Sequence, residues 1–168
     1  MAANEHKNLL DANRHYPLGY ESADNNMVIY KKTGTVYGDK TGNYGWAFPC
    51  QTFILSKDGS FTLGASTASV DYLRMPYDFR LTEVRASVGT AGAVLLTVNI
   101  KESATTILST NLTIDAGEKT STTAATPVVI SDYDLGNDNE ITIDITLGEG
   151  ESSPQDLKVY LIGYRKVG

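Results

Sequence analysis

Apolar and polar residues alternate along most of the second half of the chain. Two segments, 96–101 and 141–147, place Leu, Val or Ile at every second position, with polar residues between them. A third, 108–114, follows the same pattern except that Thr110 takes one of the apolar positions. Alternation with a period of two is typical of strands that have one face in a core and the other in water. Apart from a short candidate helix over 5–13, no segment has the spacing of an amphipathic helix, so we expect an all-β protein.

Turn-forming residues separate the alternating segments. Loops rich in Gly, Asn and Asp recur at a spacing of roughly ten residues and predict about seven or eight strands after residue 71. This pattern is typical of an antiparallel β-sandwich or jelly roll. Within 79–86 the apolar residues change from odd-numbered to even-numbered positions between Leu81 and Val84. This change favours a β-bulge at that place.

The last predicted strand is apolar on both faces. Three residues lie on each face: Leu157, Val159 and Leu161 on one, and Tyr160, Ile162 and Tyr164 on the other. A strand of this kind needs a cover on both sides. We therefore expect either that the sandwich wraps around it or that a second subunit covers the tyrosine-bearing face as an oligomer interface.

The chain before the alternating segments has a different composition. Residues 1–26 are rich in Asn, Asp and His, and a helix over 5–13 is too short to be stable alone, so this segment orders by packing against a partner. Residues 27–70 interleave glycines with aromatic residues, and Asp58-Gly59 between two β-prone runs predicts a hairpin. We expect three parts: an extended N-terminal anchoring segment over 1–26, a module of short β-hairpins over 27–70, and the sandwich over 71–168.

Charge and cysteine content narrow the classes of function. The net charge is −6 and the 14 Lys and Arg residues are scattered, which argues against binding to nucleic acid or to an anionic membrane. The single cysteine, Cys50, excludes an intramolecular disulfide and a multi-cysteine zinc site. The N-terminus has no apolar signal core, and no apolar run approaches the length of a spanning helix. We expect neither a visible export signal nor membrane insertion.

The residues that catalysis needs are sparse. The two histidines, His6 and His15, both lie in the N-terminal segment, away from a rigid element that could hold a Ser/His/Asp or Cys/His arrangement. Carboxylates are common, but nothing singles out a pair for glycoside hydrolysis. No Gly-rich phosphate motif is present. We expect no enzymatic activity and no cofactor, with a glycan-degrading enzyme as a minor alternative.

One loop is rich in the oxygen ligands that calcium prefers. Asp132, Asp134 and Asp138 lie among Asn and Glu residues between two predicted strands. Their spacing does not match the EF-hand loop. Asp and Asn more often serve as solvated turn residues, so we expect no metal here and keep calcium as the alternative.

Aromatic residues are concentrated near the N-terminus. Tyr37, Tyr44 and Trp46 interleave with glycines in a region where we predict no large core. Such side chains could stack on a host-surface glycan, or they could pack between subunits, where Tyr and Trp give much contact area at low entropy cost. We favour packing between subunits.

Residues 4–26 resemble a segment that opens many bacteriophage fibre and virion proteins. There a His-x-Asn-Leu-x-Asp-Ala-Asn-x-His-x-Pro-x-Gly run precedes a stretch of small residues and Asn, and Gly45-Trp46 is similar to the Gly/Trp ending of that module. The resemblance implies an anchor to the virus particle that consists of His6, Asn8, Leu9, Leu10, Asp11, Asn13, His15, Pro17 and Gly19.

Two further segments, 73–87 and 113–121, are similar to a β-sandwich found in phage particle proteins. The resemblance implies a virion-surface protein that is assembled in the host cytoplasm. Its N-terminus would bind the major capsid protein or another virion protein, and its sandwich would project outward as a homotrimer. The chain is short for a whole tail fibre and lacks heptads for a coiled-coil shaft. We therefore expect a short head fibre or capsid decoration protein, with a tail-associated fibre or a carbohydrate-binding adhesion module as the alternative.

Overall fold

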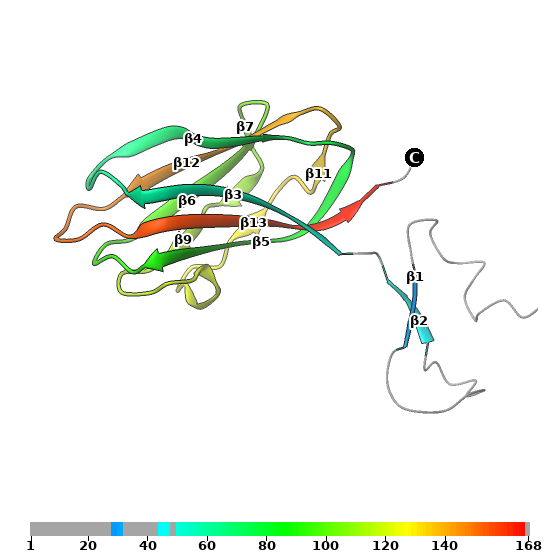
Figure 1. The fold of residues 1–168 in the computed structure, drawn as a ribbon, viewed down its shortest axis with the longest axis horizontal. Coiled ribbons are helices and arrows are strands. Elements are labelled where there is room, and N and C mark those ends of the chain that lie inside the picture. The colour runs from blue at the N-terminus through cyan, green and yellow to red at the C-terminus, as the bar shows by residue number, and fades with distance from the viewer. Residues whose placement is uncertain (1–27, 32–43, 48–49, 167–168) are drawn as a thin grey trace, which may run out of the picture. The chain divides into compact units, whose positions relative to one another are not determined.

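A computed structural model describes residues 28–31, 44–47 and 50–166 of the chain. The chain divides into two compact units, Met1–Pro49 and Cys50–Gly168. Within the first unit, β1 (Val28–Lys31) and β2 (Tyr44–Ala47) form an antiparallel pair in which Ile29 lies opposite Trp46 (Figure 1).

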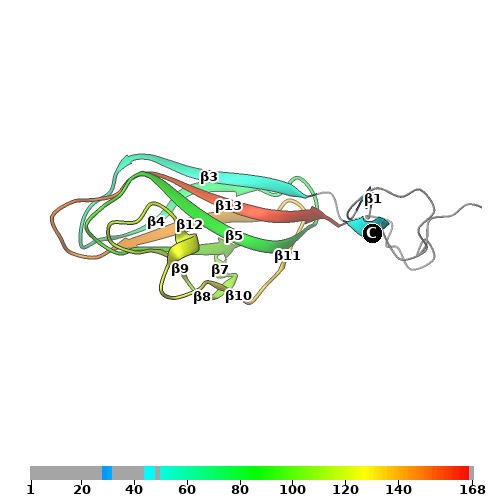
Figure 2. The ribbon, with the colours of Figure 1, turned by 90° about the horizontal axis from the view of Figure 1, so that it is seen from below.

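The described part of the second unit folds into two main antiparallel sheets, with a small pairing of β8 and β10 beside them. One sheet has the strand order β11-β5-β13-β3, and the other has the order β4-β12-β6, with β7 and β9 both paired to β6. Figure 2 shows these sheets as two layers. The elements are β3 (Gln51–Ser60), β4 (Ser66–Arg74), β5 (Phe79–Thr90), β6 (Leu96–Glu102), β7 (Thr105–Thr106), β8 (Leu108–Thr110), β9 (Leu112–Ile114), the 3-10 turn η4 (Ser121–Thr123), β10 (Val129–Ile130), β11 (Asp134–Leu135), β12 (Glu140–Leu147) and β13 (Gln155–Arg165).

The core lies between the two layers and follows the predicted alternation. In β6 and β12 the apolar residues at alternate positions are buried: Leu96, Val98, Ile100, Ile141, Ile143, Ile145 and Leu147. From the facing sheet, Phe79 is fully buried and its ring meets the ring of Phe53 edge-on, at 5.1 Å between centroids. The prediction of an all-β antiparallel sandwich is confirmed.

The predicted bulge in β5 is also confirmed. Ile162 of β13 pairs with Glu83, but the next residue, Gly163, pairs with Leu81, so Thr82 is the extra residue. The Thr82 hydroxyl donates to the Ile162 carbonyl oxygen at 3.1 Å. This carbonyl oxygen therefore has a hydrogen-bond donor at the place where the register shifts. A bulge of this kind moves the following residues to the other face, which explains why both Leu81 and Val84 are buried.

The hairpin predicted at Asp58-Gly59 is wrong, because β3 runs through both residues to Ser60. Gly59 adopts a left-handed φ of 74°, but its N–H donates to the side chain of Asp156 on β13 at 2.8 Å. The glycine therefore sits at an irregularity of the β3–β13 ladder instead of reversing the chain. The chain reverses after Ser60, where Gly64 has a φ of 64°.

The sandwich includes strands that precede residue 71, where we expected it to begin. The edge strand β3 pairs with β13 in one sheet, and β4 pairs with β12 in the other. The segment between β3 and β4 therefore crosses from one layer to the other. The second compact unit accordingly begins at Cys50.

Candidate functional site

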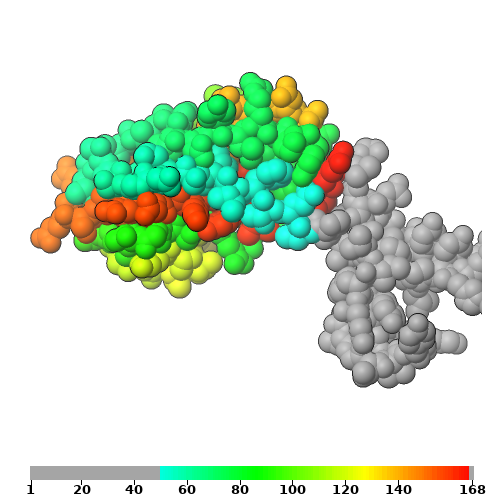
Figure 3. Space-filling model, viewed as in Figure 1, coloured from blue at the N-terminus to red at the C-terminus, as the bar shows by residue number. Residues whose placement is uncertain are grey.

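The outer surface of β3, β13 and β5 carries a row of apolar side chains. The register places Tyr160 between Ile54 on β3 and Arg85 on β5, and Ile162 between Thr52 and Glu83. We call Ile54, Tyr160 and Ile162 the outer apolar face. In the space-filling view of Figure 3, β3, β13 and β5 form the surface of the sandwich on this side.

The outer apolar face is only partly shielded from water. Ile54 is 54% exposed, and Tyr160 and Ile162 are half-buried. The opposite side of β13 is fully buried, since Leu157, Val159 and Leu161 pack into the core. Within the described residues, the sandwich thus covers one face of β13 fully and the other only in part.

A shallow hollow of about 400 Å³ lies beside Tyr160. Its lining includes Thr52, Ser87, Thr120 and Ile162. The hydroxyls of Tyr160 and Ser87 lie 3.1 Å apart and form a hydrogen bond, which fixes the tyrosine ring against β5. This hydrogen bond restricts the Tyr160 side chain before any partner arrives, which lowers the entropy cost of burying it.

Charges of both signs surround the outer apolar face. The Arg85 guanidinium donates to the Glu83 carboxylate through Nε at 2.5 Å and through Nη2 at 3.0 Å. The hydrogen bond and the negative charge of Glu83 raise the pKa of Arg85. Lys158, which lies opposite Ser87, is exposed. The surface thus has no strong charge of one sign that would select a highly charged partner.

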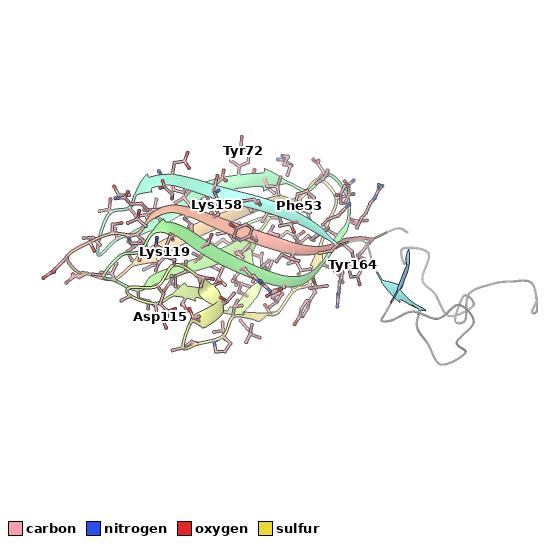
Figure 4. The ribbon with its side chains drawn as sticks, turned by 60° about the horizontal axis from the view of Figure 1, so that its bottom comes forward. Phe53, Tyr72, Asp115, Lys119, Lys158 and Tyr164 are labelled. Atoms are coloured by element: carbon pink, nitrogen blue, oxygen red, sulfur yellow. The ribbon has the colours of Figure 1, made fainter. Side chains whose placement is uncertain are left out.

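Tyr164 lies further along the same strand, opposite Arg80, and is half-buried (Figure 4). The three residues predicted for an oligomer interface, Tyr160, Ile162 and Tyr164, therefore share one strand, and their role stays a prediction. Ile54 was not among the predicted residues. Its signal was present in the run Thr52-Phe53-Ile54-Leu55, which, like the last strand, is apolar on both faces.

The acidic loop does not gather its carboxylates into a metal site. Within residues 28–31, 44–47 and 50–166, no group of three or more His, Cys, Asp or Glu side chains is placed to hold a metal ion. Asp134 instead forms ion pairs with Arg80 at 2.8 Å and Lys166 at 3.1 Å. Burial favours a higher pKa for Asp134, but the hydrogen bonds from Lys166 and Arg80 outweigh it and lower the pKa. Asp138 Oδ1 lies 3.6 Å from Arg74 Nη1 and forms an ion pair with it.

Several predicted contact residues lie outside the described residues. These are Tyr37 and all nine residues of the predicted particle anchor: His6, Asn8, Leu9, Leu10, Asp11, Asn13, His15, Pro17 and Gly19. Tyr44 and Trp46 belong to β2, of which only the backbone is described. Among the described residues, no helix is both long and apolar enough to cross a membrane.

Comparison with known proteins gives little similarity. No family model and no curated protein sequence matches the chain. Among solved structures, the chain is similar to the VP2 subviral particle of infectious bursal disease virus, with 12% identity over 80% of this chain and a TM-score of 0.38. The Gx and Gt strains of that virus give 8% identity over 80% of this chain, with TM-scores of 0.35 and 0.31. The chain spans 42% of the length of these proteins.

Proposed function

We propose that this chain is a non-enzymatic structural protein of a bacteriophage virion, a short head fibre or capsid decoration protein. Its first 26 residues attach it to the particle, and its sandwich projects outward as a homotrimer. The observation that carries the proposal is the resemblance of residues 4–26 to the opening segment of phage fibre and virion proteins. The antiparallel sandwich that follows is compatible with a projecting module of this kind.

The outer apolar face supports self-association. Ile54 is 54% exposed beside a half-buried Tyr and Ile, and covering such a surface with another subunit lowers the free energy. Arg85, Lys158 and Glu83 around it supply charges of both signs. Around a three-fold axis, a cation of one copy can therefore lie opposite an anion of the next, which makes another copy of this chain the favoured occupant.

Two carboxylates with shifted pKa values are placed to stabilise the fold instead of acting as general acids. The pKa values of Asp134 and Asp144 are both lowered. A general acid works near neutral pH only when its pKa is raised. Both groups instead remain anions that pair with Lys or Arg, as expected of carboxylates that stabilise a fold.

Addition to virions tests the attachment. We would grow the phage that encodes the chain without its gene, purify the particles and add back either the full-length protein or residues 27–168. We expect the full-length protein to sediment with the particles and the shortened protein to remain free. Equal attachment of both would overturn the anchor assignment, and attachment of neither would overturn the virion assignment.

Electron microscopy of the decorated particles separates head from tail placement. A gold label on the C-terminus should appear over the capsid. A label confined to the tail would show that the protein is a tail-associated fibre and not a head fibre. The same N-terminal resemblance is compatible with that assignment.

A further inference from the structure

The outer surface of the second sheet is almost entirely polar. The register aligns three rows across it. Ser66, Thr146, Thr97 and Thr113 form a row of hydroxyls, Asp144 and Asn99 form the next, and Tyr72, Thr142, Lys101 and Thr106 form the third. This surface belongs to the opposite layer from the outer apolar face, and its chemistry is different.

A groove of about 270 Å³ lies over the first two rows. Its polar lining includes Ser66, Thr97, Asn99, Asn111, Asp144 and Thr146. This volume is just below the roughly 300–1,000 Å³ of sites for drug-sized ligands, so it suits a ligand about as large as one sugar ring.

A β-bulge and an ion pair shape the groove. Ser69 on β4 has a left-handed φ of 50°, and its N–H donates to Asp144 Oδ1 at 2.9 Å. The ladder between β4 and β12 shifts at this place. Lys101 Nζ lies 2.5 Å from the other oxygen of Asp144, whose side chain is only 19% exposed. The two charges offset each other, so the groove presents orientable polar groups with little net charge.

Several polar groups in and beside the groove are available to a ligand. The side chains of Thr97 and Asn111 form no hydrogen bond with any described residue. Thr106 donates to the side-chain carbonyl oxygen of Asn99 at 2.6 Å, which leaves the amide nitrogen of Asn99 as a donor.

An exposed aromatic ring borders the same surface. Tyr72 is 68% exposed, the largest exposed fraction among the described large hydrophobic residues. It projects from the edge strand β4 in Figure 4 and contacts no other described ring or cation. Tyr72 pairs with Thr142 of β12. Thr142 and Asp144 are two residues apart on that strand, a separation of about 7 Å. A ring in this position offers its apolar face at the margin of a polar groove.

We propose that this surface binds a neutral oligosaccharide, with Asn99, Asn111 and Thr97 in the groove hydrogen-bonding to the hydroxyls of one sugar unit and Tyr72 stacking on the C–H face of a neighbouring unit. Sugars present both an apolar ring face and a dense set of donors and acceptors, which matches a tyrosine beside hydroxyl and amide groups. The paired charges of Asp144 and Lys101 favour a neutral sugar over an acidic or basic one. The inference does not depend on where in a virion the chain is located.

The test is binding of the full-length protein to an array of neutral and acidic oligosaccharides, followed by calorimetric titration with the strongest neutral hit. We expect a neutral oligosaccharide to bind, and we expect Tyr72→Ala and Asn99→Ala each to weaken binding about tenfold or more, the equivalent of 1.4 kcal/mol. Tyr133→Ala is the matched control, since Tyr133 is an exposed tyrosine that packs under Arg80 at 5.0 Å, away from the groove. It should leave the affinity unchanged.

Three results would overturn the proposal. The first is no binding to any neutral oligosaccharide at about 10 mM, where even weak sites are partly filled. The second is binding to acidic saccharides alone. The third is an affinity that Tyr72→Ala and Asn99→Ala leave unchanged, or that Tyr133→Ala lowers equally. Circular dichroism of each variant ensures that a loss of binding is not a loss of fold.

Discussion

Among the described glycines, Gly163 has the least space for a side chain. A Cβ at this position would lie 2.0 Å from the carbonyl oxygen of Arg80 and 2.8 Å from the ring of Phe79, at the bulge where β13 changes register with β5. Only a residue without a side chain permits this approach of two backbones.

Replacing Gly163 by Ala should therefore force β13 and β5 apart. We expect Gly163→Ala to lower the free energy of unfolding by about 1–3 kcal/mol or more, as measured by urea denaturation. Gly148→Ala is the matched control, because the nearest atoms to its Cβ lie at 3.8–4.0 Å, an ordinary contact. If the two variants were equally stable, the bulge geometry described for β13 would be wrong.

The ion pair between Asp144 and Lys101 should make stability depend on pH. Burial favours a higher pKa for Asp144, but the hydrogen bonds from Lys101 and from the Ser69 N–H outweigh it and lower the pKa below its ordinary value. A carboxyl whose folded-state pKa is lowered stabilises the protein above its unfolded pKa of about 3.9 and loses that contribution as pH falls through the lower folded-state value.

We expect Asp144→Asn to cost about 1 kcal/mol at neutral pH, with the difference from the original protein shrinking in acid. Urea unfolding between neutral and strongly acidic pH measures this difference. Glu151→Gln serves as the control, since Glu151 is exposed and forms no ion pair with a described residue. A cost for Asp144→Asn that stayed constant with pH would contradict the pairing.

At the scale of elements, the alternation of residue types predicted the strands that face one core. The segments 96–101 and 141–147 correspond to β6 and β12. The change in the spacing of apolar residues after Leu81 coincides with the bulge. The role of β3 was not predicted, because the partner of Gly59 is Asp156, nearly a hundred positions away, and a local turn pattern contains no information about it. The exposure of Ile54 and Tyr72 was missed for the same reason, since solvent exposure depends on the sheet pairing.

The contact between Gly59 and Asp156 should fix the register of β3 on β13. Asp156 has a left-handed φ of 58° and accepts the Gly59 N–H at 2.8 Å. Asp156→Ala removes the acceptor and leaves a residue that tolerates this φ poorly, so we expect a loss of about 1–2 kcal/mol. Asp156→Asn keeps an acceptor and tolerates the same φ, so it should cost much less. Equal losses from the two variants, measured by thermal unfolding, would argue against this role.

At the scale of the whole molecule, the sandwich that begins at Cys50 should fold without the preceding residues. We expect a fragment of residues 50–168 to unfold in one cooperative transition, because both sheets and the core are complete within it. A fragment of residues 71–168 lacks β3 and the first half of β4, so it should be unfolded or strongly destabilised. Calorimetry of both fragments tests this, and a stable shorter fragment would return the domain boundary to residue 71.

The outer apolar face should be the surface through which subunits meet. A charge at its most exposed position, introduced by Ile54→Lys, would have to be buried on association, and we expect it to dissociate the oligomer without unfolding the sandwich. Leu95→Lys is the matched control, since Leu95 is 45% exposed and lies outside this face. Dissociation by both variants, or by neither, would move the interface elsewhere.

The mass of the full-length protein in solution, determined by light scattering, is the first measurement to make on its self-association. We expect a trimer of three times 18.2 kDa that persists on dilution to the micromolar range. A single species of 18.2 kDa at every concentration would contradict a self-assembled fibre built on the face of Ile54, Tyr160 and Ile162.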